Sequence, residues 1–215
     1  MKVKICGLFR GDDVDYVNEA GVDFAGFVFA PSRRQLALAE AEKLRSRLVD
    51  GIVPVGVFVN APITEIVALY RNGIISMAQL HGIEDEAYIA QLKRECEIPI
   101  IKTIIIDRSK FTLTHNPSPI THDLRPMTHD PPTTTYYLLD SGAGSGIAFD
   151  WESLDTSQIE KPWFLAGGIN AGNIERAMAL NPFAIDVSSG AETAGMKDRE
   201  KILELAAKVK KGSVT

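Results

Sequence analysis

The feature that most constrains the fold is a repeated alternation of short apolar runs with segments of helical spacing. The runs are rich in Val, Ile and Phe, as expected for parallel strands that are buried on both faces. Strand–helix–strand crossovers build such a sheet, and eight strands favour closure into a barrel over an open eight-stranded sheet, which is the alternative. The eight predicted strands are Val3–Cys6, Phe24–Phe29, Val53–Phe58, Met77–Leu80, Ile98–Ile104, Tyr136–Leu139, Trp163–Ala166 and Ala184–Val187.

Segments between these strands place their apolar residues on one helical face. The chain has 215 residues, somewhat fewer than the ~250 typical of an α/β barrel but above the ~200 that suffice. We therefore predict an α/β protein with a single domain, residues 1–215, folded as a (β/α)₈ TIM barrel. The predicted helices are the segment with Val14, Val17 and Gly21, followed by Ala39–Leu48, Pro62–Tyr70, Glu84–Cys96, Asn173–Leu180 and Asp198–Lys210.

One stretch, Asp107–Thr135, breaks this pattern. It contains five prolines and no helical face, so we expect an irregular Pro/His/Thr-rich segment that replaces or shortens the fifth helix. His115, His122 and His129 recur in it at seven-residue spacing, each after a threonine. One interpretation is a metal-binding or pH-sensing loop. We favour a duplicated, solvent-facing loop, because Pro-rich loops rarely hold one geometry.

Composition excludes several classes of protein. The net charge is −5 with no basic block, which argues against nucleic-acid binding. No apolar run is long enough to span a membrane, and the first residues lack the apolar core of a signal peptide. Two cysteines, Cys6 and Cys96, are too few for a disulfide framework and lack metal-site spacing. We expect a cytoplasmic location, no cofactor or metal, no membrane or nucleic-acid partner, and a monomer, with a homodimer as the alternative.

Two residues at predicted strand ends are candidates for acid–base chemistry. In an α/β barrel, functional groups gather at the carboxyl ends of the strands and in the loops that follow. Cys6 ends the first strand, and a deprotonated thiol can act as a base or nucleophile; a buried structural cysteine is the alternative. Asp140 follows the sixth apolar run and is a candidate general acid, with a loop cap as the alternative. Cys96 ends a helix and is assigned no role.

Glycine-bearing loops follow the last three predicted strands. The loops after strands seven and eight are the recurrent phosphate site of this fold, because backbone N–H groups and a helix N-terminus face the anion there. We therefore expect a phosphorylated small-molecule substrate, with ordinary tight turns as the alternative. The candidate phosphate ligands are Gly144, Gly146, Gly167, Gly168, Ser188, Ser189 and Gly190.

Further polar side chains follow strands two and four. Arg33 and Arg34 come after the second strand, where one guanidinium could clamp a carboxylate in a bidentate manner while the other is solvated. Gln79 and His81 are two residues apart and face one side of the fourth strand. Both are candidate substrate-binding residues, and His81 is also a candidate for catalysis or for positioning another group.

Lys102 lies inside the fifth apolar run. If its side chain faces inward, it needs a partner of opposite charge. Asp186, at the last strand, is the obvious partner by residue type.

These pieces occur in an order that resembles the phosphoribosylanthranilate isomerases of tryptophan biosynthesis. Each motif is weak alone, but together, in order at the predicted strand ends from residue 2 to about residue 205, they are highly specific. Ala143 departs from the family, which often has Gly there, and the loop before Arg33 is one residue shorter. The motifs are Lys4–Gly7, Gly26–Phe29 with its Ser-Arg-Arg loop, Gly56–Asn60, Gln79–Gly82, Leu139–Ser141, Phe149–Trp151, Ala166–Gly168 and Asp186–Gly190.

The resemblance implies a reaction and a set of roles. The reaction is the Amadori rearrangement of N-(5-phosphoribosyl)anthranilate to 1-(2-carboxyphenylamino)-1-deoxyribulose 5-phosphate. Asp140 is implied as the acid that protonates the ring oxygen, and Cys6 as the base that removes the proton from C2 of the sugar. Arg34 aligns with the ligand of the anthranilate carboxylate, and Arg33 is the alternative because of the shorter loop. No metal or nucleotide is implied, since the imine is itself the electron sink.

Three other interpretations are weighed against this one. A related sugar-phosphate isomerase of histidine biosynthesis would carry Asp at the position of Cys6. A non-catalytic barrel that binds a phosphorylated ligand would need neither Cys6 nor Asp140. A metal-dependent sugar-phosphate epimerase needs several His and Asp ligands at strand ends, where only His81 qualifies.

Overall fold

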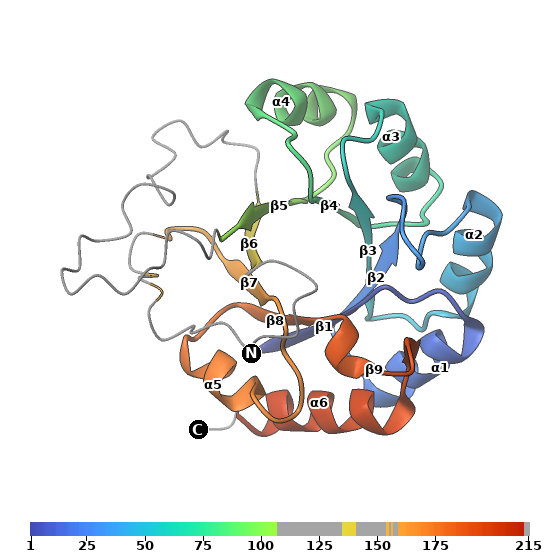
Figure 1. Ribbon diagram of the computed structural model, residues 1–215. Coiled ribbons are helices and arrows are strands. Elements are labelled where there is room, and N and C mark those ends of the chain that lie inside the picture. Colours follow the sequence, from blue (N-terminus) through green and yellow to red (C-terminus); the bar gives the residue numbers. More distant parts are fainter. Residues whose placement is uncertain (107–134, 141–153, 155, 157–158, 213–215) are drawn as a thin grey trace.

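The computed structural model describes residues 1–106, 135–140, 154, 156 and 159–212. Within them, eight parallel strands pair in chain order, and the last pairs with the first to close a barrel (Figure 1). The predicted (β/α)₈ barrel is therefore confirmed, and the open sheet is excluded. The barrel strands are β1 (Lys2–Cys6), β2 (Phe24–Val28), β3 (Val53–Phe58), β4 (Met77–Leu80), β5 (Ile100–Ile105), β6 (Tyr136–Asp140), β7 (Trp163–Ala166) and β8 (Ala184–Val187).

The helices lie around the outside of the barrel (Figure 1). Side-chain caps begin two of them, because the first N–H groups of a helix have no partner within it. Asp85 accepts a hydrogen bond from the backbone N–H of Tyr88, and Asp198 accepts one from that of Lys201. The helices are α1 (Gly11–Ala20), α2 (Leu38–Arg47), α3 (Ile63–Arg71), α4 (Glu86–Glu95), α5 (Ile174–Ala179) and α6 (Arg199–Lys211).

The predicted segments and these elements agree closely. The largest strand difference is at β5, which begins at Ile100 rather than Ile98, because Pro99 has no N–H to donate to a strand ladder. The irregular Asp107–Thr135 segment, with its three histidines, lies outside the described residues except for Thr135. None of the helices in the described part of the chain is long and apolar enough to cross a membrane.

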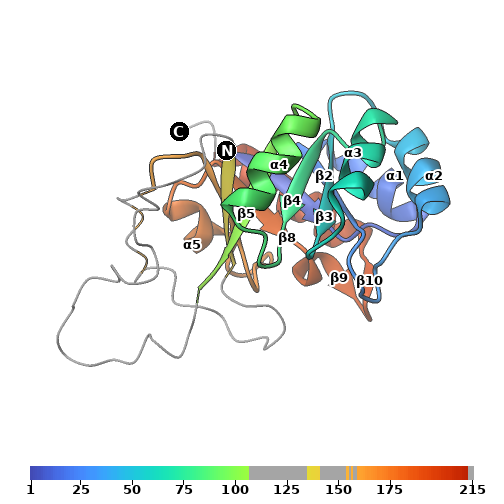
Figure 2. The ribbon, with the colours of Figure 1, turned by 90° about the horizontal axis from the view of Figure 1, so that it is seen from above.

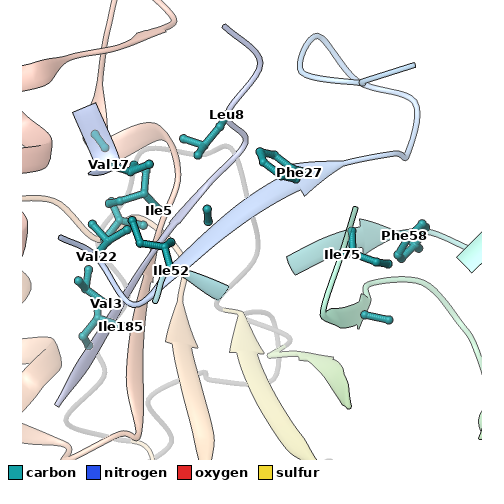
Figure 3. Close-up of a cluster of buried hydrophobic side chains, with 14 of the residues drawn as sticks. Val3, Ile5, Leu8, Val17, Val22, Phe27, Ile52, Phe58, Ile75 and Ile185 are labelled. Atoms are coloured by element: carbon teal, nitrogen blue, oxygen red, sulfur yellow. The ribbon is translucent and has the colours of Figure 1, made fainter. Parts of the chain in front are cut away.

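Two apolar layers follow from the alternation of side chains along each strand. Outward-facing residues such as Ile5, Phe27 and Ile185 pack between the strands and helices (Figure 3). Inward-facing residues fill the barrel near the beginnings of the strands, where Phe24 and Phe164 make an edge-to-face contact with ring centroids 5.3 Å apart. Farther along the strands the inward positions include buried polar residues, so polar side chains gather above the apolar floor toward the carboxyl ends, a region that we call the chamber; they are Lys4, Gln79, Thr103, Asp140 and Asp186.

A short hairpin lies beside the chamber. It consists of β9 (Glu192–Thr193) and β10 (Met196–Lys197), which follow the 3-10 helix η3 (Ser189–Ala191). Figure 2 shows the hairpin at the end of the barrel opposite the N-terminus. Arg10 and Arg33 donate to its backbone carbonyls, so it is tied to the loops after β1 and β2.

Candidate active site

Cys6 ends β1 in a space that two glycines create. The residue is 8% exposed, and its strand neighbour in β2 is Gly26. A Cβ on Gly26 would lie 2.8 Å from the Cys6 Sγ, so any other residue would displace the thiol. Gly7 has φ +82°, a conformation that favours glycine, and a Cβ there would lie 2.4 Å from Cδ of Arg34. Gly26 therefore leaves room for the thiol of Cys6, and Gly7 leaves room for the side chain of Arg34.

Lys4 provides a cation two residues before Cys6. It is completely buried, and its Nζ donates to Oδ2 of Asp186 and to Oε1 of Gln79, both at 2.9 Å. Burial alone lowers the pKa of Lys4, but Asp186 and Cys6 outweigh this effect and raise the pKa above its usual value. The ammonium group therefore remains charged inside the barrel.

The predicted pairing of Lys102 with Asp186 is wrong. Lys102 lies 3.1 Å from Oε2 of Glu84 and donates to the carbonyl of Gly82. Asp186 is taken by Lys4, because these two residues are neighbours in the register between β8 and β1. Glu84 also accepts hydrogen bonds from the backbone N–H groups of Asn60 and Gly82, so the Lys102 pair fastens the loops after β3 and β4.

The thiol of Cys6 is held mainly in its protonated form. Burial raises the pKa of Cys6, and the negative charge of Asp186 adds to that rise. The ammonium groups of Lys4 and Lys197 offset part of it. The thiolate of the free protein therefore becomes abundant only at alkaline pH.

Asp140 ends β6 and faces His81. Asp140 is 6% exposed, and its Oδ2 lies 3.5 Å from Nε2 of His81. The other ring nitrogen of His81, Nδ1, lies 3.1 Å from both Nε2 of Gln79 and Oγ1 of Thr103. Burial lowers the pKa of His81 although Asp140 acts to raise it, so the imidazole is neutral near pH 7.

These contacts form one polar chain across the barrel. It runs from Asp186 through Lys4, Gln79 and His81 to Asp140. Oδ1 of Asp186 is buried and accepts no hydrogen bond from the described residues. Such an acceptor is costly to leave unpaired, so a donor from water or from a bound molecule would stabilise it.

Arg34 and Arg33 converge on one carboxylate, that of Glu192. Nε and Nη2 of Arg34 donate to Glu192 at 2.8 and 2.9 Å, and Arg33 and Lys197 also donate to it. Burial acts to raise the pKa of Glu192, but these cations outweigh it and lower the pKa. The side chain of Arg34 is 18% exposed and that of Arg33 is 53% exposed, so Arg34 is the arginine enclosed at the chamber.

The loops after β7 and β8 touch each other. Gly167 and Gly168 have φ +98° and +67°, which glycine adopts readily. A Cβ on Gly190 would lie 1.9 Å from the carbonyl oxygen of Ile169, so the contact requires glycine. The hydroxyl of Ser188 donates to the carbonyl of Cys6 at 3.2 Å. The two late loops therefore form one surface beside Cys6, while Gly144 and Gly146 lie outside the described residues.

Sequence reasoning assigned no role to three residues that shape this site. The sequence did contain a signal for Lys4, because a charged residue in an apolar strand, two positions from Cys6, shares a face with it. Gly26 carried a weaker one, because glycine inside a strand marks a close approach. Glu192 carried none, since it follows no strand directly. Among the described residues, no group of three or more His, Cys, Asp and Glu side chains could hold a metal ion.

Comparisons with known proteins agree with this geometry. A family model described as N-(5'phosphoribosyl)anthranilate (PRA) isomerase matches residues 3–208. The N-(5'-phosphoribosyl)anthranilate isomerase of Endomicrobium trichonymphae is 42% identical over 204 residues, which are 94% of this chain and 95% of that protein. The enzyme of that name from Streptococcus mutans is 37% identical over 98% of this chain and 99% of its own length.

Solved structures give the same result. The phosphoribosyl anthranilate isomerase from Thermus thermophilus superposes with a TM-score of 0.80 at 32% identity, covering 100% of both chains. The enzyme from Thermotoga maritima gives a TM-score of 0.81 at 28% identity, covering 98% of this chain and 99% of that one. The chain belongs to the N-(5'-phosphoribosyl)anthranilate isomerase family.

Proposed function

We propose that this chain catalyses the Amadori rearrangement of N-(5-phosphoribosyl)anthranilate in tryptophan biosynthesis, with Cys6 as general base and Asp140 as general acid. Family membership supplies the substrate. The observation that carries the assignment of roles is that a buried thiol and a buried carboxyl end β1 and β6 of one closed barrel, at the same face. The reaction needs one base and one acid on opposite sides of a bound sugar.

Ring opening is the task of Asp140. Its carboxyl proton passes to the furanose oxygen, the bond between that oxygen and C1 breaks, and the nitrogen lone pair forms the C1=N bond of an iminium ion. Asp140 is left as a carboxylate. His81, 3.5 Å away, is placed to interact with that charge.

Proton abstraction is the task of Cys6. Its thiolate takes the proton from C2, and the electrons of the C–H bond form a C1=C2 bond while the iminium nitrogen becomes neutral. The enol hydroxyl on C2 then gives up its proton and C1 gains one, which yields the ketone. The number of protons is unchanged overall, as an isomerisation requires. Lys4 favours the thiolate because it is a fixed cation beside it.

The two ends of the substrate are held by different groups. We assign the anthranilate carboxylate to Arg34, because its guanidinium is enclosed and Nη1 contacts no acceptor among the described residues. Arg33 is the less suited of the two, since it is exposed and bound to Gly195. The phosphate is assigned to the late glycine loops, in which the predicted ligands are Gly144, Gly146, Gly167, Gly168, Ser188, Ser189 and Gly190.

Three further properties are part of the proposal. The chain acts as a single domain. It is cytoplasmic, because Cys6 and Cys96 are free and a base requires a reduced thiol. It is a monomer, because the exposed large apolar residues in the described part of the chain come from different elements and loops; they are Leu38, Val49, Val59, Ile83, Ile105 and Met196.

A coupled fluorescence assay tests the function. Anthranilate and phosphoribosyl pyrophosphate, joined by a phosphoribosyltransferase, generate the unstable substrate in the cuvette, and its fluorescence is followed in the presence of a metal chelator. We expect rapid loss of fluorescence with the wild type and none with Cys6→Ala or Asp140→Ala. A folded wild-type protein that leaves the signal unchanged would refute the proposal, and the histidine-pathway substrate would be assayed next.

A further inference from the structure

The side chain of Gln79 joins groups that serve opposite sides of the chamber. Gln79 lies in β4 and is 2% exposed. Its Oε1 lies 2.9 Å from Nζ of Lys4, which stands beside Cys6, and its Nε2 lies 3.1 Å from Nδ1 of His81, which faces Asp140. Both ends of the amide thus have partners within the protein.

Lys4 fixes the orientation of this amide. An ammonium group donates hydrogen bonds and accepts none, so the amide atom that faces it must be the carbonyl oxygen. Rotating the amide by half a turn would set its NH₂ group against the ammonium and leave two buried donors without acceptors, which is unfavourable. Lys4 cannot yield by losing its proton, because it is also paired with Asp186 at 2.9 Å.

The orientation of Gln79 in turn fixes the proton of His81. The amide nitrogen donates toward Nδ1, so Nδ1 must present its lone pair. The hydroxyl of Thr103, also 3.1 Å from Nδ1, can rotate to donate to the same atom. A neutral imidazole with an unprotonated Nδ1 carries its hydrogen on Nε2, the nitrogen that lies 3.5 Å from Oδ2 of Asp140.

We infer that Gln79 is a positioning residue. Because Lys4 fixes the orientation of the Gln79 amide, the amide fixes the tautomer of His81, with the Nε2–H directed at Asp140. This inference deepens the proposed function, on which its catalytic meaning rests. When Asp140 gives its proton to the ring oxygen, the carboxylate that remains accepts a hydrogen bond from the waiting Nε2–H. A preorganised donor at a developing charge lowers the barrier without reorganisation. His81 keeps its proton throughout the step.

Nitrogen NMR of the full-length, ¹⁵N-labelled protein reads this tautomer directly. We expect Nδ1 of wild-type His81 to resonate as an unprotonated nitrogen and Nε2 as a protonated one. A His81→Gln sample identifies the signals by their disappearance, since the chain has four histidines. The wild-type spectrum requires no substrate or turnover.

The decisive variant is Gln79→Glu, which keeps the shape of the side chain. Its carboxylate still accepts from Lys4 but can only accept at His81, so Nδ1 must become protonated, either in the other neutral tautomer or in the imidazolium. We expect that change in the spectrum and a fall in kcat of about 10–100-fold with KM little altered, because the contact acts in the transition state. Thr103→Val is the matched control: it removes the other neighbour of Nδ1, leaves the Gln79 amide in place, and should keep the wild-type tautomer.

Two results would overturn the inference. One is a wild-type spectrum with a proton on Nδ1 of His81. The other is a folded Gln79→Glu protein that retains both the wild-type tautomer and the wild-type kcat. If the wild type showed the expected tautomer but no isomerase activity, the proposed function would fail while the structural role of Gln79 would stand.

Discussion

Nζ of Lys4 lies 2.9 Å from Oδ2 of Asp186, and this ion pair bridges the first and last strands of the barrel. It does two things at one place. It fastens the seam where the sheet closes, and it holds a positive charge beside the thiol of Cys6. A buried ion pair adds little net stability compared with apolar residues, but loss of one partner leaves an unpaired buried charge.

Lys4→Met should therefore affect both stability and catalysis. We expect the free energy of unfolding to fall by about 3–5 kcal/mol, because Asp186 is left charged and buried. The pKa of Cys6 should rise further, and each unit of rise lowers the thiolate fraction at neutral pH about tenfold. Urea denaturation and titration of the thiolate absorbance measure the two effects. In the double variant Lys4→Met/Asp186→Leu, stability should largely return while activity stays low. If the single and double variants lost equal amounts of stability, the unpaired charge of Asp186 would not be the cause.

The pH dependence of kcat/KM should follow ionisation of Cys6. A base acts only when deprotonated, and burial raises the pKa of this thiol. We therefore expect kcat/KM to climb from about pH 6 to beyond pH 8, by up to tenfold per unit. Steady-state rates across this range provide the measurement, and Cys6→Asp, whose carboxyl ionises at lower pH, should flatten the climb. A flat profile in the wild type would remove Cys6 from the role of base.

Gly26→Ala tests the space around the thiol. The added methyl group would stand 2.8 Å from Sγ of Cys6, so the thiol must move. A misplacement of about 1 Å costs on the order of 100-fold in rate, and overpacking costs about 1–3 kcal/mol of stability. Gly56→Ala is the matched control, because its methyl group would meet Phe58 at 2.7 Å in the outer layer instead. We expect similar losses of stability in the two variants and a large drop in kcat in Gly26→Ala alone. Equal kcat values in the two variants would show that Gly26 does not position the thiol of Cys6.

Glu192→Gln should separate binding from chemistry. Arg34 would lose the carboxylate that orients it, so we expect KM to rise about tenfold with kcat changed less than threefold. The pKa of Glu192 is lowered from its usual 4.5, so its stabilising contribution is complete above that pH and is lost as pH falls through the lowered pKa. In acid unfolding followed by circular dichroism, the variant should therefore lack the part of the pH dependence of stability that Glu192 contributes. A change confined to kcat would be evidence against the assignment of Arg34.

Gly190→Ala tests the phosphate assignment. Its methyl group would clash with the carbonyl of Ile169 and push the two late loops apart. We expect weaker competitive inhibition by inorganic phosphate and a higher KM, each by about tenfold or more. Gly73→Ala, at φ +69° with open space around it, should cost about 1 kcal/mol of stability and leave phosphate inhibition unchanged. Equal phosphate inhibition in Gly190→Ala and the wild type would place the phosphate elsewhere.

The parts of this molecule that follow from local pattern could be predicted from sequence. Buried strands appear in the sequence as apolar runs. The rule that functional groups of an α/β barrel lie at strand ends selects Cys6 and Asp140 as candidates. The partner of Lys102 could not be predicted, because it depends on which strands become neighbours and in what register. By charge type alone, Asp186 was the expected partner of Lys102. In the structure the register between β8 and β1 pairs Asp186 with Lys4, and Lys102 pairs with Glu84.

The position of Glu192 is a different kind of failure. It lies in the hairpin after β8, where it meets side chains from the loop after β2. No local spacing encodes a contact between loops so far apart in the chain. The interpretations placed on Asp107–Thr135, Gly144 and Gly146 stay predictions, since those positions lie outside the described residues apart from Thr135.

The closure of β8 against β1 also determines when a newly made chain can first act. Cys6 is synthesised well before Asp186 and Ser188, which meet its strand where the barrel closes. Every nascent chain that ends before β8 lacks the seam and the Lys4–Asp186 ion pair next to Cys6. A product truncated before β8 should therefore be inactive, and synthesis of that strand is the step that completes the surroundings of Cys6.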